Sequence, residues 1–203
     1  MTNERVVEIP WLLSRLGKPA RILDIGSAFA SYLTAMLEVC GEVVALDTHP
    51  FNTVDGVQVV LGDASDLPED WSNHFDLVTC VSVLDHIGLE AYGNSANLQA
   101  LQLSSCEMLR VLQPGGRLLV TVPFGQDRVT IHPDGGQRVF GIEALHSLFP
   151  LNTWNWLGVW FWNLSGDEYL PSNEESCKAV GYDSSYGRAE SVVAIELEKA
   201  VEP

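Results

Sequence analysis

Basic residues are scarce in this chain of 203 residues, because 11 Lys and Arg stand against 27 Asp and Glu, which gives a formal net charge of −16. A field of that sign repels phosphate backbones and anionic lipid surfaces. The composition therefore argues against nucleic acid as a substrate. It identifies no other substrate, since a solvated acidic surface gives the same balance.

Long apolar segments are also missing. No run of about 18 or more apolar residues occurs, and the first residues, MTNERVVEIPWLL, lack the basic start and small-residue cleavage site of a signal peptide. We therefore expect no membrane insertion and a cytoplasmic location. The 46% hydrophobic and 19% charged residues are typical of a globular protein, and the length predicts one domain over residues 1–203.

Motifs typical of metal sites are absent as well. The four cysteines show no C-x-x-C pair and no zinc spacing; they are Cys40, Cys80, Cys106 and Cys177. Reduced thiols in the core are the expected role, with a catalytic thiol at Cys80 as the alternative. No two-histidine helix motif or calcium loop occurs. We predict no metal, although Asp63, Asp85 and His86 could approach one another around a cation.

Short apolar runs alternate with helical stretches, which indicates βαβ units and a parallel sheet. Predicted strands cover residues 21–25, 42–46, 57–61, 75–81 and 117–122, and predicted helices cover 30–39, 97–112 and 141–149. Apolar strands over 154–164 and 191–198 predict an antiparallel edge, and the polar stretch 165–190 predicts a long loop or lid. The predicted fold class is α/β, a doubly wound Rossmann-like sheet of about seven mostly parallel strands with an antiparallel C-terminal edge.

Polar residues follow the predicted strands, at the edge where open parallel sheets bind ligands. Asp24 and Gly26 lie at the end of the first strand, where glycine lets the backbone approach a ligand closely. Asp47 lies 23 residues after Asp24, at the end of the second strand. A carboxylate at that place can accept both hydroxyls of a ribose.

Five stretches resemble the class I S-adenosylmethionine-dependent methyltransferases in order and spacing, over about residues 21–125 with a weaker continuation to the C-terminus. They are RILDIGSAFA, VVALDTHP, LGDASDLP, FDLVTCVSVLDHIGL and LRVLQPGGRLLVTVPFG. The resemblance implies S-adenosylmethionine as the cofactor. Ala28 and Ala30 stand where the first motif of the family has glycine, so the turn must accommodate two Cβ atoms. The same departure counts against a dinucleotide oxidoreductase, which needs Gly-x-Gly-x-x-Gly.

The resemblance also implies which residues hold the cofactor. Four residues after the first strand would line its methionine and ribose portions: Asp24, Gly26, Ser27 and Ala28. Asp47 would hold the ribose diol, and Thr48 would touch the adenosine. Asp63 would accept from the adenine amino group, with Ala64 beside the ring. Two residues at the end of the fourth strand would border the cofactor: Val81 and Ser82.

The segments SVLDHIGLEAYG, VPFG and HPDGGQRVFGIEAL resemble a branch of that superfamily associated with polysaccharide biosynthesis. The matching residues of its glycine-leucine and tyrosine-glycine steps are Gly88, Leu89, Tyr92 and Gly93. This likeness implies a sugar or glycan hydroxyl as the acceptor, within the wider class of small-molecule acceptors. Tyr92 would lie on the pocket wall or pack against a helix.

A hydroxyl acceptor must lose its proton, and an imidazole suits that task. His86 follows the fourth strand on the cofactor side, so we predict that it is the general base, with Asp85 as its orienter or as a substrate contact. The alternative is that His86 caps the next helix or packs beside the cofactor. His132 is a second catalytic candidate, because the loop after the fifth strand can cover an acceptor pocket.

The late strand carries a cluster of aromatic residues: Trp154, Trp156, Trp160, Phe161 and Trp162. They could stack on a sugar, but core packing or the interface of a homodimer is the expected role. Two alternatives to a methyltransferase remain open. One is a non-catalytic cofactor-binding or scaffold protein with the same fold, and the other is an oxidoreductase.

Overall fold

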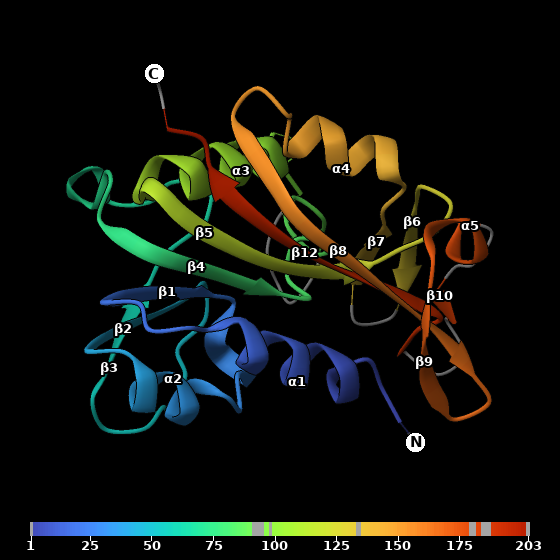
Figure 1. Cartoon of the computed structure of the whole chain (residues 1–203), viewed down its shortest axis with the longest axis horizontal. Coiled ribbons are helices and arrows are strands. Elements are labelled where there is room, and N and C mark those ends of the chain that lie inside the picture. Colours follow the sequence, from blue (N-terminus) through green and yellow to red (C-terminus); the bar gives the residue numbers. More distant parts are fainter. Residues whose placement is uncertain are drawn as a thin grey trace.

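The structure is a computed structural model that describes residues 2–90, 96–97, 99–132, 135–178, 182–183 and 188–201, and for 130–132, 135 and 182–183 it describes the backbone only. In these ranges eight strands form the central sheet (Figure 1). Their spatial order is β3 (Val57–Leu61), β2 (Glu42–Asp47), β1 (Arg21–Ile25), β4 (Phe75–Val81), β5 (Leu112–Pro123), β12 (Ser191–Lys199), β8 (Trp154–Ser165) and β9 (Glu168–Ser172).

The sheet is parallel from β3 to β5 and antiparallel beyond it. β1 pairs in parallel with β2 and with β4, so that Ile22 lies opposite Val43 on one side and opposite Leu77 on the other. β12 runs antiparallel to β5 and β8, and β9 runs antiparallel to β8. The predicted doubly wound sheet with an antiparallel C-terminal edge is confirmed, with eight strands in the described residues instead of about seven.

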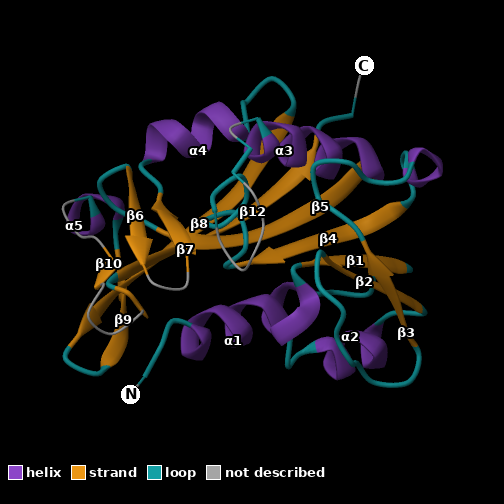
Figure 2. Cartoon of the chain, turned by 180° about the vertical axis from the view of Figure 1, so that it is seen from behind, coloured by secondary structure: helices purple, strands orange, loops and turns teal. Residues whose placement is uncertain are grey.

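Helices cover both faces of this sheet, as Figures 1 and 2 show. One face carries α1 (Arg5–Arg15) and α2 (Leu33–Val39), and the other carries α3 (Ala100–Val111) and α4 (Ile142–Leu148). Because successive strand residues point to opposite faces, Ile22 joins the core under α1 and α2, whereas Leu23 joins the core under α3 and α4. Among the described residues no helix is long and apolar enough to cross a membrane.

Most predicted elements are present, with shifts at their ends. β1, β3 and β4 have the predicted bounds. The helix predicted from residue 30 begins at Leu33, because the chain first forms a 3-10 turn, η1 (Ser27–Phe29), and Ala30 is extended. A second 3-10 turn, η2 (Glu69–Trp71), precedes β4. The helix α1 was not predicted, since Pro10 lies inside it and proline usually marks a helix end.

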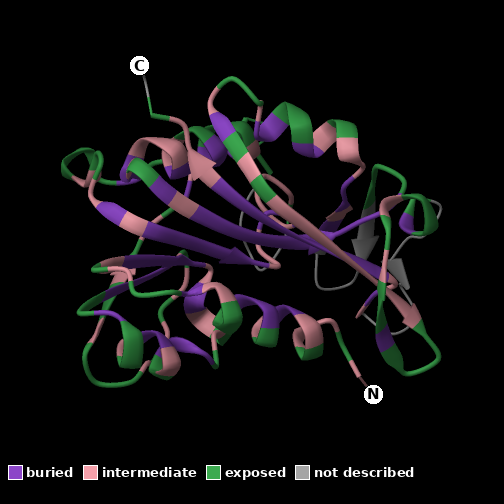
Figure 3. Ribbon diagram, viewed as in Figure 1, coloured by how far each residue is buried: buried purple, intermediate pink, exposed green. Residues whose placement is uncertain are grey.

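The segment 165–190, predicted as a long loop, contains regular structure. Besides β9 it holds α5 (Glu174–Cys177), β10 (Tyr182–Asp183) and β11 (Arg188–Ala189). The loop prediction is therefore wrong for residues 168–177. An edge strand has one hydrogen-bonded neighbour and exposes polar residues, so the sequence of β9 shows little apolar pattern. Figure 3 shows exposed residues on β9 and also on β3, which forms the other edge of the sheet. A role as a lid stays a prediction.

The hairpin of β6 (Arg128–His132) and β7 (Gly135–Val139) was not predicted either. Its strands pair antiparallel, from Arg128 opposite Val139 to His132 opposite Gly135. A single bridge joins Phe124, just after β5, to Phe140, just after β7. The hairpin therefore leaves the main sheet at the carboxyl end of β5, next to the ends of the parallel strands.

The aromatic residues of β8 divide between the two faces of the sheet. On one face the Trp160 ring lies 5.6 Å from the Trp11 ring of α1, and the guanidinium of Arg15 lies 4.4 Å from Trp160. On the other face Phe161 lies 5.0 Å from Phe124. Trp154 is buried, and the other four aromatic residues pack against the two cores as partly buried residues, which agrees with the expected core role. A homodimer stays a prediction.

Candidate functional site

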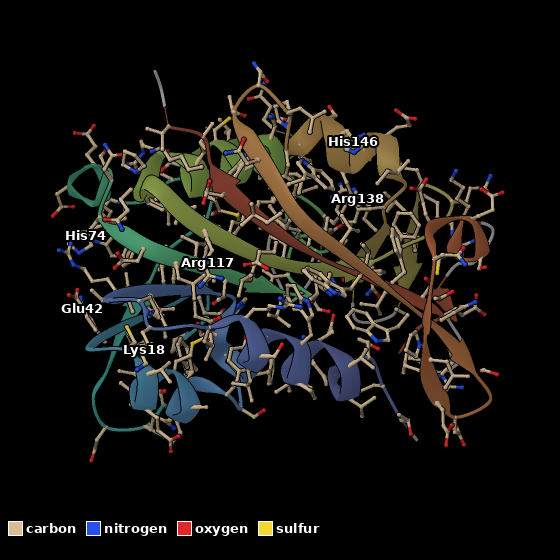
Figure 4. All side chains as sticks on the ribbon, viewed as in Figure 1. Lys18, Glu42, His74, Arg117, Arg138 and His146 are labelled. Atoms are coloured by element: carbon tan, nitrogen blue, oxygen red, sulfur yellow. The ribbon has the colours of Figure 1, made fainter. Side chains whose placement is uncertain are left out.

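A cavity of about 800 Å³ opens at the carboxyl ends of the parallel strands, within the range of roughly 300–1,000 Å³ that small-molecule sites span. It lies where β1 and β4 are neighbours but their connections leave toward opposite edges, the place where this architecture binds ligands. Glu42 and His74, labelled in Figure 4, lie at the opposite, amino ends of β2 and β4. The loops after β1, β2, β3 and β4 line the cavity together with the start of α1 and Gln137 of β7.

The turn after β1 forms the floor of the cavity. Gly26 has a left-handed backbone with φ 80°, and a Cβ atom there would lie 2.2 Å from Cγ2 of Val83, so only glycine fits. Ala30 has φ −75° and ψ 101°, which any residue adopts. The backbone therefore explains why alanine is accommodated at that motif position. Gly26, Ala28 and Ala30 line the cavity.

Asp24 and Ser27, both predicted to line the cofactor, lie behind this turn and are not among the described residues that line the cavity. Asp24 is fully buried. Its Oδ1 accepts hydrogen bonds from Thr79 at 2.5 Å and from Tyr32 at 3.2 Å, and its Oδ2 accepts one from Ser27 at 2.7 Å. The Asp24 carboxyl group thus holds the floor turn onto β1 and β4. Burial raises its pKa from the ordinary 3.8 to about 6, although the three donors oppose the shift.

This raised pKa makes a pH-dependent contribution to stability. A carboxyl group with a higher pKa in the folded state favours folding when protonated, and that contribution is lost as the pH rises from 3.8 through about 6. One pKa unit corresponds to about 1.4 kcal/mol, so the raised pKa of Asp24 lowers the stability of the folded protein at neutral pH by about 3 kcal/mol. Asp24→Asn keeps the shape and removes the charge. We expect its unfolding free energy, relative to the wild type, to rise by about 2.5 kcal/mol between pH 4 and pH 7.5 in urea titrations. A difference in unfolding free energy between Asp24→Asn and the wild type that is the same at all pH values would contradict the raised pKa of Asp24. Asp70→Asn, which makes the same change at an exposed position, is the control.

The loop after β2 presents Asp47 to the cavity. Its Oδ2 accepts a hydrogen bond from the backbone N–H of Ala28 at 2.9 Å, and its Oδ1 accepts one from the N–H of His49 at 3.0 Å. These two bonds fix the carboxylate between the first two loops. Each oxygen keeps a further lone pair, so the group can receive two donors of a ligand. Thr48 also lines the cavity, and its Oγ1 lies 2.9 Å from Nδ1 of His49.

The loop after β3 adds Asp63 and Ala64 to the same wall. Oδ1 of Asp63 accepts from the N–H and the hydroxyl of Ser65, both at 2.8 Å, which forms a local turn. The backbone N–H of Gly62 donates to the carbonyl of Asp47 at 3.0 Å and ties this loop to the preceding one. Ala64 is buried beside it. The predicted adenine-side residues therefore do share the cavity with Asp47.

The end of β4 is held by a residue of α1 that the sequence analysis did not single out. Glu8 is fully buried, and its Oε1 accepts from the hydroxyls of Ser82 at 2.6 Å and Thr121 at 2.7 Å. Ser82 has φ 49°, a strained conformation for a non-glycine residue. Arg5 donates to Oε2 of Glu8 and to the carbonyl of Val81, both at 3.1 Å. This network brings Arg5 to the cavity beside Val81 and Ser82, which both line it as predicted.

Asp85 and His86 lie on the β4 side of the cavity and line it. Oδ2 of Asp85 accepts from Nε2 of Gln137 at 2.8 Å and lies 3.3 Å from Nε2 of His86. Nδ1 of His86 lies 3.0 Å from the carbonyl of Gly136. Because a carbonyl only accepts, Nδ1 carries a proton, and in the neutral ring Nε2 is the basic atom. The pair can therefore accept a proton and stabilise the resulting imidazolium.

Other predicted residues of the acceptor side can be placed only in part. The backbone of His132 ends β6 opposite Gly135, but its side chain lies outside the description. Tyr92 and Gly93 lie outside the described residues. Cys80 is fully buried and does not line the cavity, and burial raises the pKa of its thiol, so it serves the core. Among the described residues no group of three or more His, Cys, Asp or Glu side chains could hold a metal ion.

Arg5 and Gln137 are among the cavity-lining residues that sequence reasoning missed. Arg5 is 76 residues from Val81, to whose carbonyl it donates, and Gln137 is 52 residues from Asp85. One signal was available for Arg5, because an arginine stands out in a chain with so few basic residues. Gln137 had no comparable signal.

Comparisons with known proteins agree with this geometry. Residues 23–120 match the family model of a methyltransferase domain. The comparison with curated proteins gives no match. A Burkholderia thailandensis 1,6-didemethyltoxoflavin-N1-methyltransferase, solved with 1,6-didemethyltoxoflavin and S-adenosylhomocysteine, is similar with a TM-score of 0.67 and 17% identity, over 95% of this chain and 76% of that one.

Two further solved structures are similar over nearly the whole chain. The N-methyltransferase NodS from Bradyrhizobium japonicum WM9, in complex with S-adenosylhomocysteine, has a TM-score of 0.62 and 14% identity over 97% of this chain and 88% of its own. An S-adenosylmethionine-dependent methyltransferase from Methanosarcina mazei has a TM-score of 0.67 and 16% identity, over 95% of this chain and 98% of the other. At such identities the likeness shows the fold. The domain match is limited to residues 23–120, and the likeness over nearly the whole chain shows a fold shared with S-adenosylmethionine-dependent methyltransferases.

Proposed function

We propose that this protein transfers the methyl group of S-adenosylmethionine to a hydroxyl group of a small-molecule or glycan-linked acceptor. The observation that carries the proposal is a single cavity with two chemically different sides. Asp47 and Asp63 lie on its β2–β3 side, where a nucleoside needs hydrogen-bond acceptors. Asp85 and His86 lie on its β4 side, where a hydroxyl needs a base.

The cofactor side fits S-adenosylmethionine residue by residue, and the domain match and the structures with bound S-adenosylhomocysteine support that cofactor. Asp47 would accept both ribose hydroxyls, and Asp63 would accept from the adenine amino group. Gly26 and Ala28 would contact the methionine portion. Arg5 is the one arginine or lysine among the described residues that line the cavity, so we assign the methionine carboxylate to it.

The acceptor side supplies the proton chemistry. S-adenosylmethionine bound there would supply an electrophilic methyl group for the new O–CH₃ bond, with its sulfur as the leaving group. His86 takes the hydroxyl proton on Nε2, while its Nδ1–H donates to the carbonyl of Gly136 at 3.0 Å. Asp85, with Oδ2 3.3 Å from that Nε2, stabilises the imidazolium. Most of the rate comes from alignment of acceptor, methyl and sulfur, which the walls of the cavity provide.

Two measurements on the purified protein test the function. Calorimetry should detect binding of S-adenosylhomocysteine and none of NAD, and radiolabelled methyl groups should pass from S-adenosylmethionine to hydroxylated acceptors. Tight binding of NAD without binding of S-adenosylhomocysteine would overturn the assignment and favour an oxidoreductase. Cofactor binding without transfer to any acceptor would favour a non-catalytic cofactor-binding protein.

A further inference from the structure

One buried oxygen of the cavity wall has no hydrogen-bond partner among the described residues. Asp85 is fully buried, and its Oδ1 accepts no hydrogen bond from the part of the chain that the structure describes. Buried atoms of Trp11 and Arg15 share this property, but these residues do not line the cavity. An unpaired buried acceptor costs free energy. A ligand that donates a hydrogen bond to Asp85 Oδ1 would remove this cost.

The rest of Asp85 is held in place by the β6–β7 hairpin. Gln137 donates to Oδ2 at 2.8 Å, and the backbone N–H of Arg138 donates to the carbonyl of Asp85 at 2.8 Å. His86 lies 3.3 Å from the same Oδ2. The protein therefore uses one oxygen of the carboxylate and leaves the other to a ligand. A group whose orientation is fixed in this way discriminates between ligands, because it cannot turn to find another partner.

The charges of the cavity limit what can approach Asp85. Four acids line it, Glu4, Asp47, Asp63 and Asp85, and Arg5 is the one lysine or arginine among the described residues that line it. Arg5 is assigned to the cofactor carboxylate. The described lining of the acceptor side then offers hydrogen-bond acceptors and no lysine or arginine, so a phosphate on the reacting ring would be repelled.

We propose that Asp85 Oδ1 accepts a hydrogen bond from a second donor on the carbon next to the reacting hydroxyl. The acceptor class is then a vicinal diol or amino alcohol without phosphate on the reacting ring, such as an uncharged pyranoside. The inference rests on the proposed function, because it takes His86 as the base for the first hydroxyl. Asp85 and His86 are sequence neighbours, and Oδ2 of Asp85 lies 3.3 Å from Nε2 of His86, so they can meet two neighbouring donors of one ligand.

The test uses a panel of methyl pyranosides that differ in configuration, with labelled S-adenosylmethionine and the wild-type protein. For a glycoside that is methylated, the neighbouring hydroxyl is replaced by hydrogen, by fluorine and by an amino group. We expect the deoxy and fluoro analogues to lose about a hundredfold in kcat/KM, since neither donates a hydrogen bond. The amino analogue keeps a donor and should stay within about tenfold of the parent.

The variant Asp85→Asn separates recognition from folding. Its amide can keep the bond with Gln137 but places an N–H₂ donor where Oδ1 was, so the preference for the parent over the deoxy analogue should fall from about a hundredfold to below about fivefold. The affinity for S-adenosylhomocysteine should stay within about twofold of the wild type. Asp70→Asn makes the same charge change at an exposed position and should alter neither quantity.

Three results would overturn the proposal. The first is methylation of the deoxy or fluoro analogue as fast as the parent, or of no pyranoside at all. The second is preferred methylation of a ring phosphate ester over its uncharged counterpart. The third is a tenfold loss of S-adenosylhomocysteine affinity in Asp85→Asn, which would assign Asp85 to the cofactor ammonium. If the wild type binds no S-adenosylhomocysteine, the proposed function itself fails.

Discussion

Asp47→Ala should weaken binding of S-adenosylhomocysteine at least about a hundredfold. The Asp47 carboxylate is oriented by the N–H groups of Ala28 and His49, so it is positioned for the ribose before the ligand arrives. Two charge-assisted hydrogen bonds of about 1.5–3 kcal/mol each would be lost, and each 1.4 kcal/mol is about tenfold in affinity. Calorimetry with the wild type and the variant measures the difference.

A modified ligand shows whether this loss comes from the ribose. The wild type should bind S-adenosylhomocysteine more tightly than its 2′-deoxyribose analogue, and Asp47→Ala should bind the two alike, because the carboxylate that distinguishes them is gone. Asp55→Ala, a nearby exposed position, is the matched control and should bind as the wild type does. Affinity of Asp47→Ala within about threefold of the wild type would contradict the assignment of the ribose.

His86→Ala should lower kcat at least about a hundredfold and leave the affinity for S-adenosylhomocysteine nearly unchanged. General-base catalysis typically contributes about 10²–10⁴-fold, whereas His86 lies on the acceptor side of the cavity, away from Asp47 and Asp63. Steady-state kinetics give kcat, and calorimetry gives the affinity. Unchanged turnover would leave His86 with a packing or capping role.

The pH profile distinguishes a base from a structural histidine. The pH dependence of kcat should differ between the wild type and His86→Ala, because the variant lacks the group that accepts the proton. His74→Ala removes a histidine at the opposite end of the sheet, where His74 lies 3.6 Å from Glu42 (Figure 4). This control should keep both the rate and the profile. A profile shared by the wild type and His86→Ala would exclude His86 as the base.

The meeting of Asp47 and Asp63 in one cavity was predictable because it depends on local sequence. Alternating apolar runs identify the strands, and residues that follow parallel strands meet at one edge of the sheet. Asp47 and Asp63 therefore reach the same cavity, as expected. Asp24 is the exception, because whether a carboxylate at the end of a strand points toward a ligand or into the core depends on neighbours such as Thr79 of β4.

The acceptor side was less predictable for a related reason. Gln137 reaches Asp85 only because the β6–β7 hairpin folds back beside the end of β4, and no periodicity in residues 124–140 indicates this return. The same holds for α1, whose Pro10 obscures the helical pattern and whose Glu8 holds Arg5 at the end of β4.

By itself, the sequence determined the order of strands and helices and the acids that follow the strands, since both depend on residues close together in the chain. Only the tertiary structure decided that Asp24 faces inward, that Arg5 lines the cavity and that Oδ1 of Asp85 has no partner among the described residues. These features depend on contacts between residues about 50 or more positions apart. Such contacts form through packing of whole elements, which local patterns do not encode.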